Sequence, residues 1–181
     1  MDYKSLKKAL EQISATMDDQ RDYLISLDQQ NGDGDLGKLL LKCSSVFNEA
    51  APSSLGTITA FGFMGMAKAL KGKTEASYAE VVAALDAGIA QIMAKAKSKP
   101  GEKTILDAIY PAVEELKKFD GSDKKAAFDA AAKAAAEGSE NTKNMRSVHG
   151  RAAYYAEKSL GVLDGGSVVG RLVFEAIAKS V

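Results

Sequence analysis

Three carboxylates and three glycines lie within one ten-residue stretch, from Asp28 to Gly37. The acids are Asp28, Asp33 and Asp35, at offsets of zero, five and seven. A regular α-helix would not place these offsets on one face, whereas a loop between two helices could bring the three carboxylates together. Converging carboxylates repel one another unless a cation neutralises them, and hard oxygen ligands favour Mg²⁺ or Ca²⁺ over zinc. The stretch is therefore a candidate metal site.

A solvated turn and an EF-hand loop are the other interpretations of this stretch. Asn-Gly and Asp-Gly are ordinary turn signals, so the stretch alone does not separate a solvated turn from a metal site. An EF-hand loop that begins at Asn31 lacks the required glycine and glutamate at Leu36 and Lys42. One that begins at Asp33 fails at Gly37, where Asp or Asn is needed. The EF-hand is therefore the disfavoured interpretation.

Other polar loops precede predicted helices and could receive phosphate, because a helix N-terminus offers free N–H groups and the positive end of the helix dipole. Ser53 and Ser54 add hydroxyls at one such start, where simple N-capping is the alternative. Arg151 could offer its planar guanidinium to a phosphate. A lone arginine more often forms a surface ion pair, so that alternative also stays open.

The segment from Pro100 to Asp107 contains Lys103 and Thr104 but is not a P-loop. The pattern Gly-x-x-x-x-Gly-Lys is missing, and no strand precedes the segment. Asp107 lies one helical turn after Lys103 and Thr104 and could pair with either. His149 is the only histidine, and no Ser or Cys nucleophile motif lies near it, so we assign it no catalytic role.

Length and charge limit the class of protein. A chain of 181 residues suits one domain with a substantial core. Lys+Arg and Asp+Glu are both 24, so no basic field indicates nucleic-acid binding. Cys43 is the only cysteine, which fits a reducing compartment. Neither a secretory signal nor an apolar run near the ~20 residues of a membrane span is present. We expect a cytoplasmic protein without nucleic-acid or membrane partners.

The elements that must position these loops are predicted to be helices. Apolar side chains recur at helical spacing, Ser77–Glu80 reads as a capping box, and no convincing period-two strand occurs. About eight helices joined by short loops predict an all-α, antiparallel up-and-down bundle in a single domain, residues 1–181. The predicted helices include those around Leu6–Ile13, Ile58–Leu70, Val82–Ile92, Lys103–Lys118, Asp123–Glu137, Thr142–Leu160 and Ser167–Val181.

Several of these segments, in this order, resemble the L subunit of dihydroxyacetone kinase, the nucleotide-binding subunit. That family has an Asp followed by Gly-Asp-Gly/Ala-Asp-His-Gly and later a serine-glycine loop. It continues with a Pro-Gly-Asp-Lys-Thr-Met-x-Asp helix start and a Gly-Arg-Ala-Ser-Tyr helix that ends in an Asp-Pro-Gly loop. The matching segments here are Asp28 with Gly32–Gly37, Ser53-Ser54, Pro100–Asp107, Gly150–Tyr154 and Asp164–Gly166. Together they cover residues 20–170, most of the chain.

The resemblance implies a closed ring of eight amphipathic antiparallel helices with a nucleotide bound at one end. It implies that Asp28, Asp33 and Asp35 hold two Mg²⁺ ions that bridge the phosphates of ADP or ATP. Ile105 stands where the family has Met, against the adenine. The cofactor-binding residues implied in this way are Leu36, Gly37, Lys38, Leu39, Ser53, Ser54, Ile105, Arg151, Asp164, Gly165 and Gly166.

The resemblance also implies partners. In that family a separate K subunit holds the ketone, so phosphoryl transfer crosses a subunit interface. In phosphoenolpyruvate-dependent members an M subunit recharges the bound ADP, and a free-standing L chain is typical of that type. The implied function is therefore phosphorylation of dihydroxyacetone, or a similar short ketose, by a kinase subunit that is active only with its partners.

Leu36 replaces the usual His of the family, Leu39 replaces a common Asn, and the serine loop reads Ser-Ser-Leu-Gly in place of Ala-Ser-Gly-Pro. These departures leave open which ketose is used and whether ADP stays bound or ATP exchanges. A nucleotide-loaded binding module that signals to a partner such as a transcription regulator, without turnover, is the alternative function. A helical protein with no ligand is disfavoured because it gives no reason for the three-aspartate loop.

Overall fold

The computed structural model describes residues 34–51 and 53–181. The chain divides into two compact units, Met1–Asp35 and Leu36–Val181, and the helices below belong to the second unit. No residue in the described ranges lies in a strand, so the predicted all-α class is confirmed. The helix expected around Leu6–Ile13 lies outside the described residues. The helices are α3 (Leu36–Ala50), α4 (Ser54–Ala69), α5 (Tyr78–Ala96), α6 (Leu106–Leu116), α7 (Lys124–Asn141) and α8 (Gly165–Ser180), with the short 3₁₀ segments η1 (Thr142–Asn144) and η2 (Arg151–Ser159).

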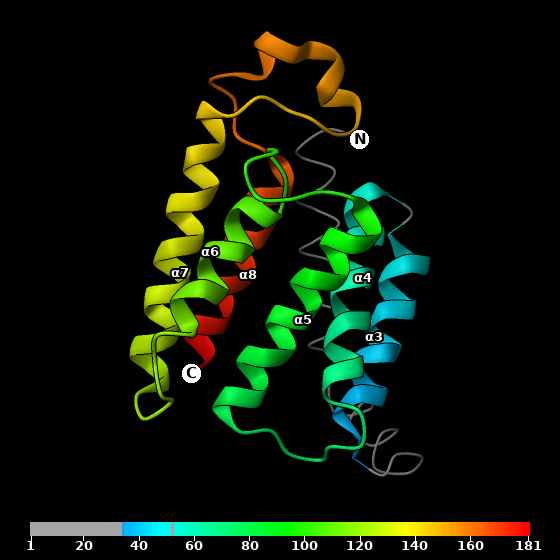
Figure 1. The fold of residues 1–181 in the computed structure, drawn as a ribbon, viewed down its shortest axis with the longest axis vertical. Coiled ribbons are helices and arrows are strands. Elements are labelled where there is room, and N and C mark those ends of the chain that lie inside the picture. The colour runs from blue at the N-terminus through cyan, green and yellow to red at the C-terminus, as the bar shows by residue number, and fades with distance from the viewer. Residues whose placement is uncertain (1–33, 52) are drawn as a thin grey trace. The chain divides into compact units, whose positions relative to one another are not determined.

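Successive helices of this unit run in alternating directions, with a long connection only between α7 and α8 (Figure 1). α3 packs on α4 and α4 packs on α5, while α6, α7 and α8 pack on one another. α4 begins, α5 ends, α6 begins, α7 ends and α8 begins at the same end of the unit, which is uppermost in Figure 1. α3 begins at the other end. None of the helices in the described part has the length and apolar character that a membrane crossing requires.

Side-chain caps start several of the helices. At α5 the Ser77 hydroxyl accepts from the Glu80 N–H, and the Glu80 carboxylate accepts from the Ser77 N–H at 2.8 Å, which confirms the predicted capping box. The ammonium of Lys73 lies 2.7 Å from the same carboxylate. Hydrogen bonds from Lys73 and then from Ser77 lower the pKa of Glu80 to about 2. Asp123 caps α7, with its carboxylate accepting from the Ala126 N–H at 2.8 Å.

Small and branched apolar residues from α5, α6, α7 and α8 fill one core. Leu106, Val113 and Leu116 of α6 are almost completely buried. The alanine-rich sequence of α7 lets this helix approach its neighbours closely, because its buried face carries short side chains. A Cβ at Gly138 of α7 would lie only 2.1 Å from the Asp107 carbonyl oxygen. The Asp107 carbonyl lacks the usual helical hydrogen bond from the residue four positions later, because Pro111 has no N–H. Gly138 of α7 therefore packs directly against this carbonyl.

Two helix predictions are wrong in detail. The helix expected over Thr142–Leu160 is absent, because only η1 and η2 form there and Met145 between them is extended. The Lys103 ammonium takes the carbonyls of Met145 and Ser159, which a continuous helix would use internally. The helix expected from Lys103 begins only at Leu106, since Lys103 has the left-handed value φ 61°.

Candidate functional site

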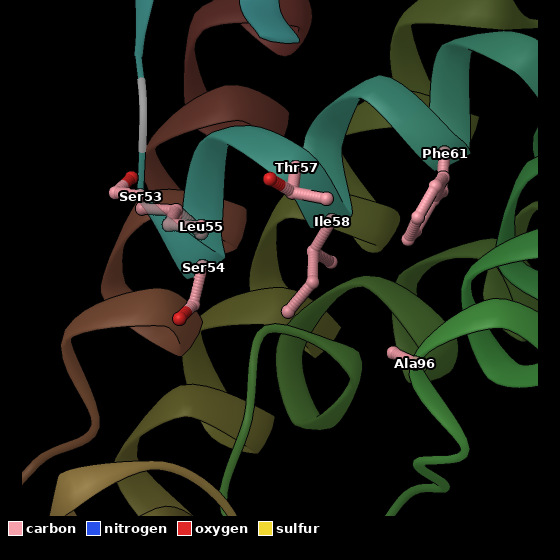
Figure 2. Close-up of a pocket in the computed structure, with 7 residues that line it drawn as sticks. All are labelled: Ser53, Ser54, Leu55, Thr57, Ile58, Phe61 and Ala96. Atoms are coloured by element: carbon pink, nitrogen blue, oxygen red, sulfur yellow. The ribbon is translucent and has the colours of Figure 1, made fainter.

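The start of α4 presents hydroxyl groups at one end of the unit. Ser53 is the N-cap residue, and its Oγ accepts from the Gly56 N–H at 3.1 Å. The capping interpretation is therefore correct for Ser53. A Cβ at Gly56 would lie 2.0 Å from the Ala51 carbonyl oxygen, so glycine is needed for this tight turn. Figure 2 shows Ser54 and Thr57 beside this cap, each presenting a hydroxyl group.

A hollow of about 890 Å³ opens beside this helix start, between α4 and the end of α5. Its walls combine three hydroxyl side chains with an apolar surface that includes Ile58, Phe61 and Ala96 (Figure 2). A few hydroxyl groups beside an apolar wall suit a ligand with a flat apolar part and a polar part, and the volume is within the usual range for small-molecule sites. The lining residues are Ser53, Ser54, Leu55, Thr57, Ile58, Phe61 and Ala96.

Asp107 shapes the loop between α5 and α6. Its two carboxylate oxygens accept from the backbone N–H groups of Gly101 at 2.5 Å and Thr104 at 2.6 Å. The expected pairing with Thr104 therefore uses its backbone, and the Lys103 ammonium points to other acceptors. Gly101 has φ 93°, which suits glycine in a tight turn. This turn sets Ile105 at the first position before α6, where it is buried.

The start of α8 lies directly against the start of α6. Asp164 caps α8 by accepting from the Ser167 N–H at 2.7 Å, and its own N–H donates to the Thr142 hydroxyl at 3.1 Å. A Cβ at Gly166 would lie 3.2 Å from the backbone nitrogen of Ile105, so the two segments touch. Burial raises the pKa of the Asp164 carboxyl, despite the hydrogen bond from the Ser167 backbone. The structure thus brings together Ile105 and Asp164–Gly166.

Two side chains before α6 hold the segment that joins α7 to α8, and sequence reasoning did not single them out for this role. The Lys103 ammonium donates to three backbone carbonyls of that segment. Glu102 pairs with His149, with 2.6 Å between Oε2 and Nε2. The hydrogen bond from His149 and that from the Lys99 backbone lower the pKa of Glu102. The sequence offered only a weak signal for these contacts, namely a lysine and a glutamate in a glycine-containing turn and a single histidine elsewhere.

Leu36–Leu39 lie at the opposite end of the α3–α4 pair from Ser53. The Leu36 N–H donates to the Lys73 carbonyl at 2.7 Å, just beyond the end of α4. Gly37 packs against the same end, since a Cβ there would lie 2.7 Å from the Ala67 carbonyl oxygen. The 15 residues of α3 rise about 22 Å at 1.5 Å each. The predicted nucleotide contacts within the second unit therefore fall into two groups, at opposite ends of these two helices.

The three predicted metal ligands are only partly within the described residues. Asp28 and Asp33 lie outside them, and Asp35 directly precedes α3. Within residues 34–51 and 53–181, no group of three or more His, Cys, Asp or Glu side chains could hold a metal ion. The backbone of Arg151 begins η2, and the structure does not describe its side chain. The predicted roles of Asp28, Asp33, Asp35 and Arg151 therefore stay predictions.

A family model described as the DAK2 domain matches residues 5–179. The chain belongs to the DAK2 domain family. The resemblance to the L subunit of dihydroxyacetone kinase is thereby confirmed. It is supported by the ADP-binding subunit DhaL of PEP-dependent dihydroxyacetone kinase 2 from Listeria innocua, which is 27% identical over 100% of this chain and 96% of that protein. The DhaL of dihydroxyacetone kinase 1 from the same organism is also 27% identical, over 94% of this chain.

Other relatives are larger enzymes. Triokinase/FMN cyclase of Homo sapiens is 30% identical over 97% of this chain, and D-erythrulose kinase of Mycolicibacterium smegmatis is 29% identical over 96%. The chain spans only 35% of the length of each of these two proteins. Their names support a kinase subunit in general terms.

Solved structures confirm the helical fold. The native dihydroxyacetone kinase of C. freundii matches 100% of this chain and 35% of its own chain, with a TM-score of 0.63 at 23% identity. The same kinase in complex with AMP-PNP and Mg²⁺ matches 93% of this chain and 32% of its own, with a TM-score of 0.62 at 24% identity. At these identities the likeness establishes the fold alone.

Proposed function

We propose that this chain is the nucleotide-binding subunit of a phosphotransferase that uses Mg-ADP/ATP to phosphorylate dihydroxyacetone or a similar short ketose. The observation that carries the proposal is the family match over residues 5–179. It is supported by the Listeria ADP-binding subunit, which matches this chain over nearly the full length of both proteins.

The nucleotide site in this proposal includes the end of the unit where α4, α6 and α8 begin. The hollow beside Ile58 and Phe61 offers an apolar wall for a base, and nearby hydroxyls offer hydrogen bonds to a sugar or a phosphate. Arg151 and Asp164–Gly166 would close over the nucleotide, with Ile105 against the adenine. The start of α4 adds backbone N–H groups of the kind that bind anions, whereas Asp164 accepts from the Ser167 N–H at the start of α8.

Asp28, Asp33 and Asp35 would hold two Mg²⁺ ions. An all-carboxylate donor set suits Mg²⁺, and neutralising phosphate charge is what Mg²⁺ supplies in phosphoryl transfer, so this loop and the hollow beside α4 are two separate parts of the proposal. Leu36–Leu39, which follow this loop in the chain, lie about a helix length from Ser53. The aspartate loop and the α4 start therefore need separate variants in the binding test.

The chain would form one domain, a closed ring of about eight antiparallel helices. The ketose would sit on a K-type partner subunit, and an M-type phosphotransferase subunit would recharge ADP in the cytoplasm. The Listeria relative supports this type of assembly, because its name places it in a PEP-dependent kinase.

Calorimetric titration of ADP and ATP into the nucleotide-stripped chain, with Mg²⁺ and then with EDTA, tests the binding step. We expect Mg-dependent binding of ADP that is weakened by Ser54→Ala, whose hydroxyl lines the hollow. Ser45→Ala, on the exposed surface of α3, is the matched control. If neither nucleotide bound, the proposed function would be wrong.

Turnover separates the kinase from a binding module that signals without turnover. The chain would be combined with K-type and M-type subunits of a dihydroxyacetone kinase, phosphoenolpyruvate and dihydroxyacetone or erythrulose. Formation of the sugar phosphate only when this chain is present supports the kinase. Tight nucleotide binding with no product from either ketose would favour the binding module.

A further inference from the structure

Lys103 is buried at the candidate site and uses all of its donors on the protein. The residue is 6% exposed, and its ammonium lies 3.2 Å from the Met145 carbonyl, 2.5 Å from that of Ser159 and 2.7 Å from that of Val162. An ammonium has three N–H donors and no acceptor. With three carbonyls bound, no donor remains for a phosphate, so Lys103 does not act as a ligand-binding lysine in this arrangement.

The three carbonyls come from both ends of one segment, residues 145–162, which links α7 to α8. Met145 lies near its beginning, whereas Ser159 and Val162 lie near its end. One side chain therefore ties the two ends of the segment together and fixes them to the turn before α6. Charge-assisted hydrogen bonds of this kind are about twice as strong as neutral ones.

Several of the described apolar side chains in this segment are largely exposed. Among its described apolar side chains, Val148 is 53% exposed, Tyr154 is 90% exposed and Val162 is 59% exposed. The remaining ties to the turn before α6 are the Glu102–His149 pair and a 3.4 Å hydrogen bond from the Val148 N–H to the Glu102 carbonyl. Two further hydrogen bonds hold the ends of the segment, from the Ser147 N–H to the Ser159 hydroxyl at 3.0 Å and from the Gly161 N–H to the Lys143 carbonyl at 2.8 Å, but neither reaches the turn before α6. We therefore expect the hydrogen bonds of Lys103 to decide whether the segment stays on that turn.

The backbone conformation of Lys103 supports the same conclusion. Lys103 has φ 61°, a conformation that L-residues other than Asn and Asp adopt rarely. Glycine would adopt this backbone more easily, so backbone preference gives no reason for lysine here. The side chain gives that reason, because only a long cationic side chain reaches three carbonyls from a buried position.

We propose that Lys103 is a positioning residue that latches the segment 145–162 onto the start of α6, next to the nucleotide site. The part of this proposal that concerns nucleotide rests on the proposed function, since the segment carries Arg151 and leads into Asp164. Without the latch, the segment would open while the core of α6, α7 and α8 stays folded.

Hydrogen exchange of the full chain, with and without Mg-ADP, tests the latch. Lys103→Met keeps the apolar stem and removes the ammonium, and Lys103→Gly also relieves the backbone conformation. We expect both variants to raise amide exchange within 145–162 by tenfold or more and to leave the interior of α6 and α7 unchanged. Lys125→Met is the matched control, because Lys125 donates to the Ala178 carbonyl at 3.0 Å, at the opposite end of α7.

Binding of ADP provides the second readout. We expect both Lys103 variants to raise the Kd for Mg-ADP about tenfold, although Lys103 has no free donor for the nucleotide. Unchanged exchange in both folded variants would overturn the latch. Faster exchange with an unchanged Kd would overturn the positioning role. Failure of the wild-type chain to bind ADP would count against the proposed function alone, because exchange still reports on the latch.

Discussion

Carboxylates at the candidate site act on the backbone. Asp107 accepts from two backbone N–H groups and Asp164 caps α8, so both acids shape loops. Helical spacing correctly indicated that Asp107 lies near Lys103 and Thr104. It could not show that the Thr104 backbone is the donor, because the left-handed conformation of Lys103 turns that N–H towards the carboxylate.

Glu102 makes stability depend on pH at the residue scale. Its pKa lies below the ordinary value of 4.5, chiefly because of the hydrogen bond from His149. Its contribution to the free energy of unfolding is therefore complete above about pH 4.5 and is lost as the pH falls through the lower, folded-state pKa. We expect Glu102→Gln to reduce the loss of stability between pH 6 and pH 3, measured by urea unfolding at a series of pH values.

Glu157→Gln is the matched control for that experiment. Glu157 lies in the segment 145–162, which also contains His149, and it pairs with Arg146, but both side chains are 63% exposed. Exposed pairs contribute little, so this variant is expected to keep the wild-type pH dependence. An identical pH dependence in Glu102→Gln and wild type would contradict our account of Glu102.

At the scale of elements, the close approach of α6 and α7 depends on Gly138. A Cβ there would lie 2.1 Å from the Asp107 carbonyl oxygen and 3.0 Å from a ring carbon of Pro111. We expect Gly138→Ala to lower the free energy of unfolding by about 1–3 kcal/mol, since the helices must move apart. Urea unfolding measures this change. Gly165→Ala is the control, because its Cβ would meet nothing within 4 Å, and an equal effect of the two variants would refute the explanation.

The start of α5 depends on its capping box. Ser77→Ala removes the hydroxyl that accepts from Glu80, and we expect a loss of about 1 kcal/mol in the free energy of unfolding. The exposed Ser45→Ala on α3 serves as the control in the same urea titration. A Ser77→Ala variant as stable as wild type would mean that Lys73 and other contacts suffice to start the helix.

Over the whole molecule, periodicity and caps predicted the helices well where apolar packing determines them. The all-α class, the start of α5 and the alanine-rich α7 are examples. The segment 142–160 was missed because its conformation depends on a lysine about forty residues earlier, a contact that local pattern does not contain.

The sequence motifs also could not predict where the expected nucleotide contacts lie relative to one another. Motif order suggested one site, yet Leu36–Leu39 and Ser53 lie at opposite ends of α3 and α4. The alignment with the Listeria subunit extends over 207 positions against 181 residues here, so at least 26 positions have no counterpart in this chain.

The loop that contains Asp28, Asp33 and Asp35 gives a prediction about nucleotide binding by the whole chain. We expect Asp33→Ala to abolish Mg-dependent ADP binding and to leave the helix content near normal, measured by calorimetry and circular dichroism. Asp129→Ala is the control, an exposed acid on α7 that pairs with Lys125. If Asp33→Ala bound Mg-ADP as tightly as wild type, Asp33 would not be a metal ligand.

The nearest-neighbour packing of the helices has a consequence for folding. Contacts in the described unit form chiefly between helices that follow one another, and α5 packs less extensively on α6 than on α4. Such contacts close short loops at little entropic cost, so chains of this kind fold quickly. Because α5 shares one apolar core with α6, α7 and α8, we expect the helices of this unit to fold together in one cooperative step.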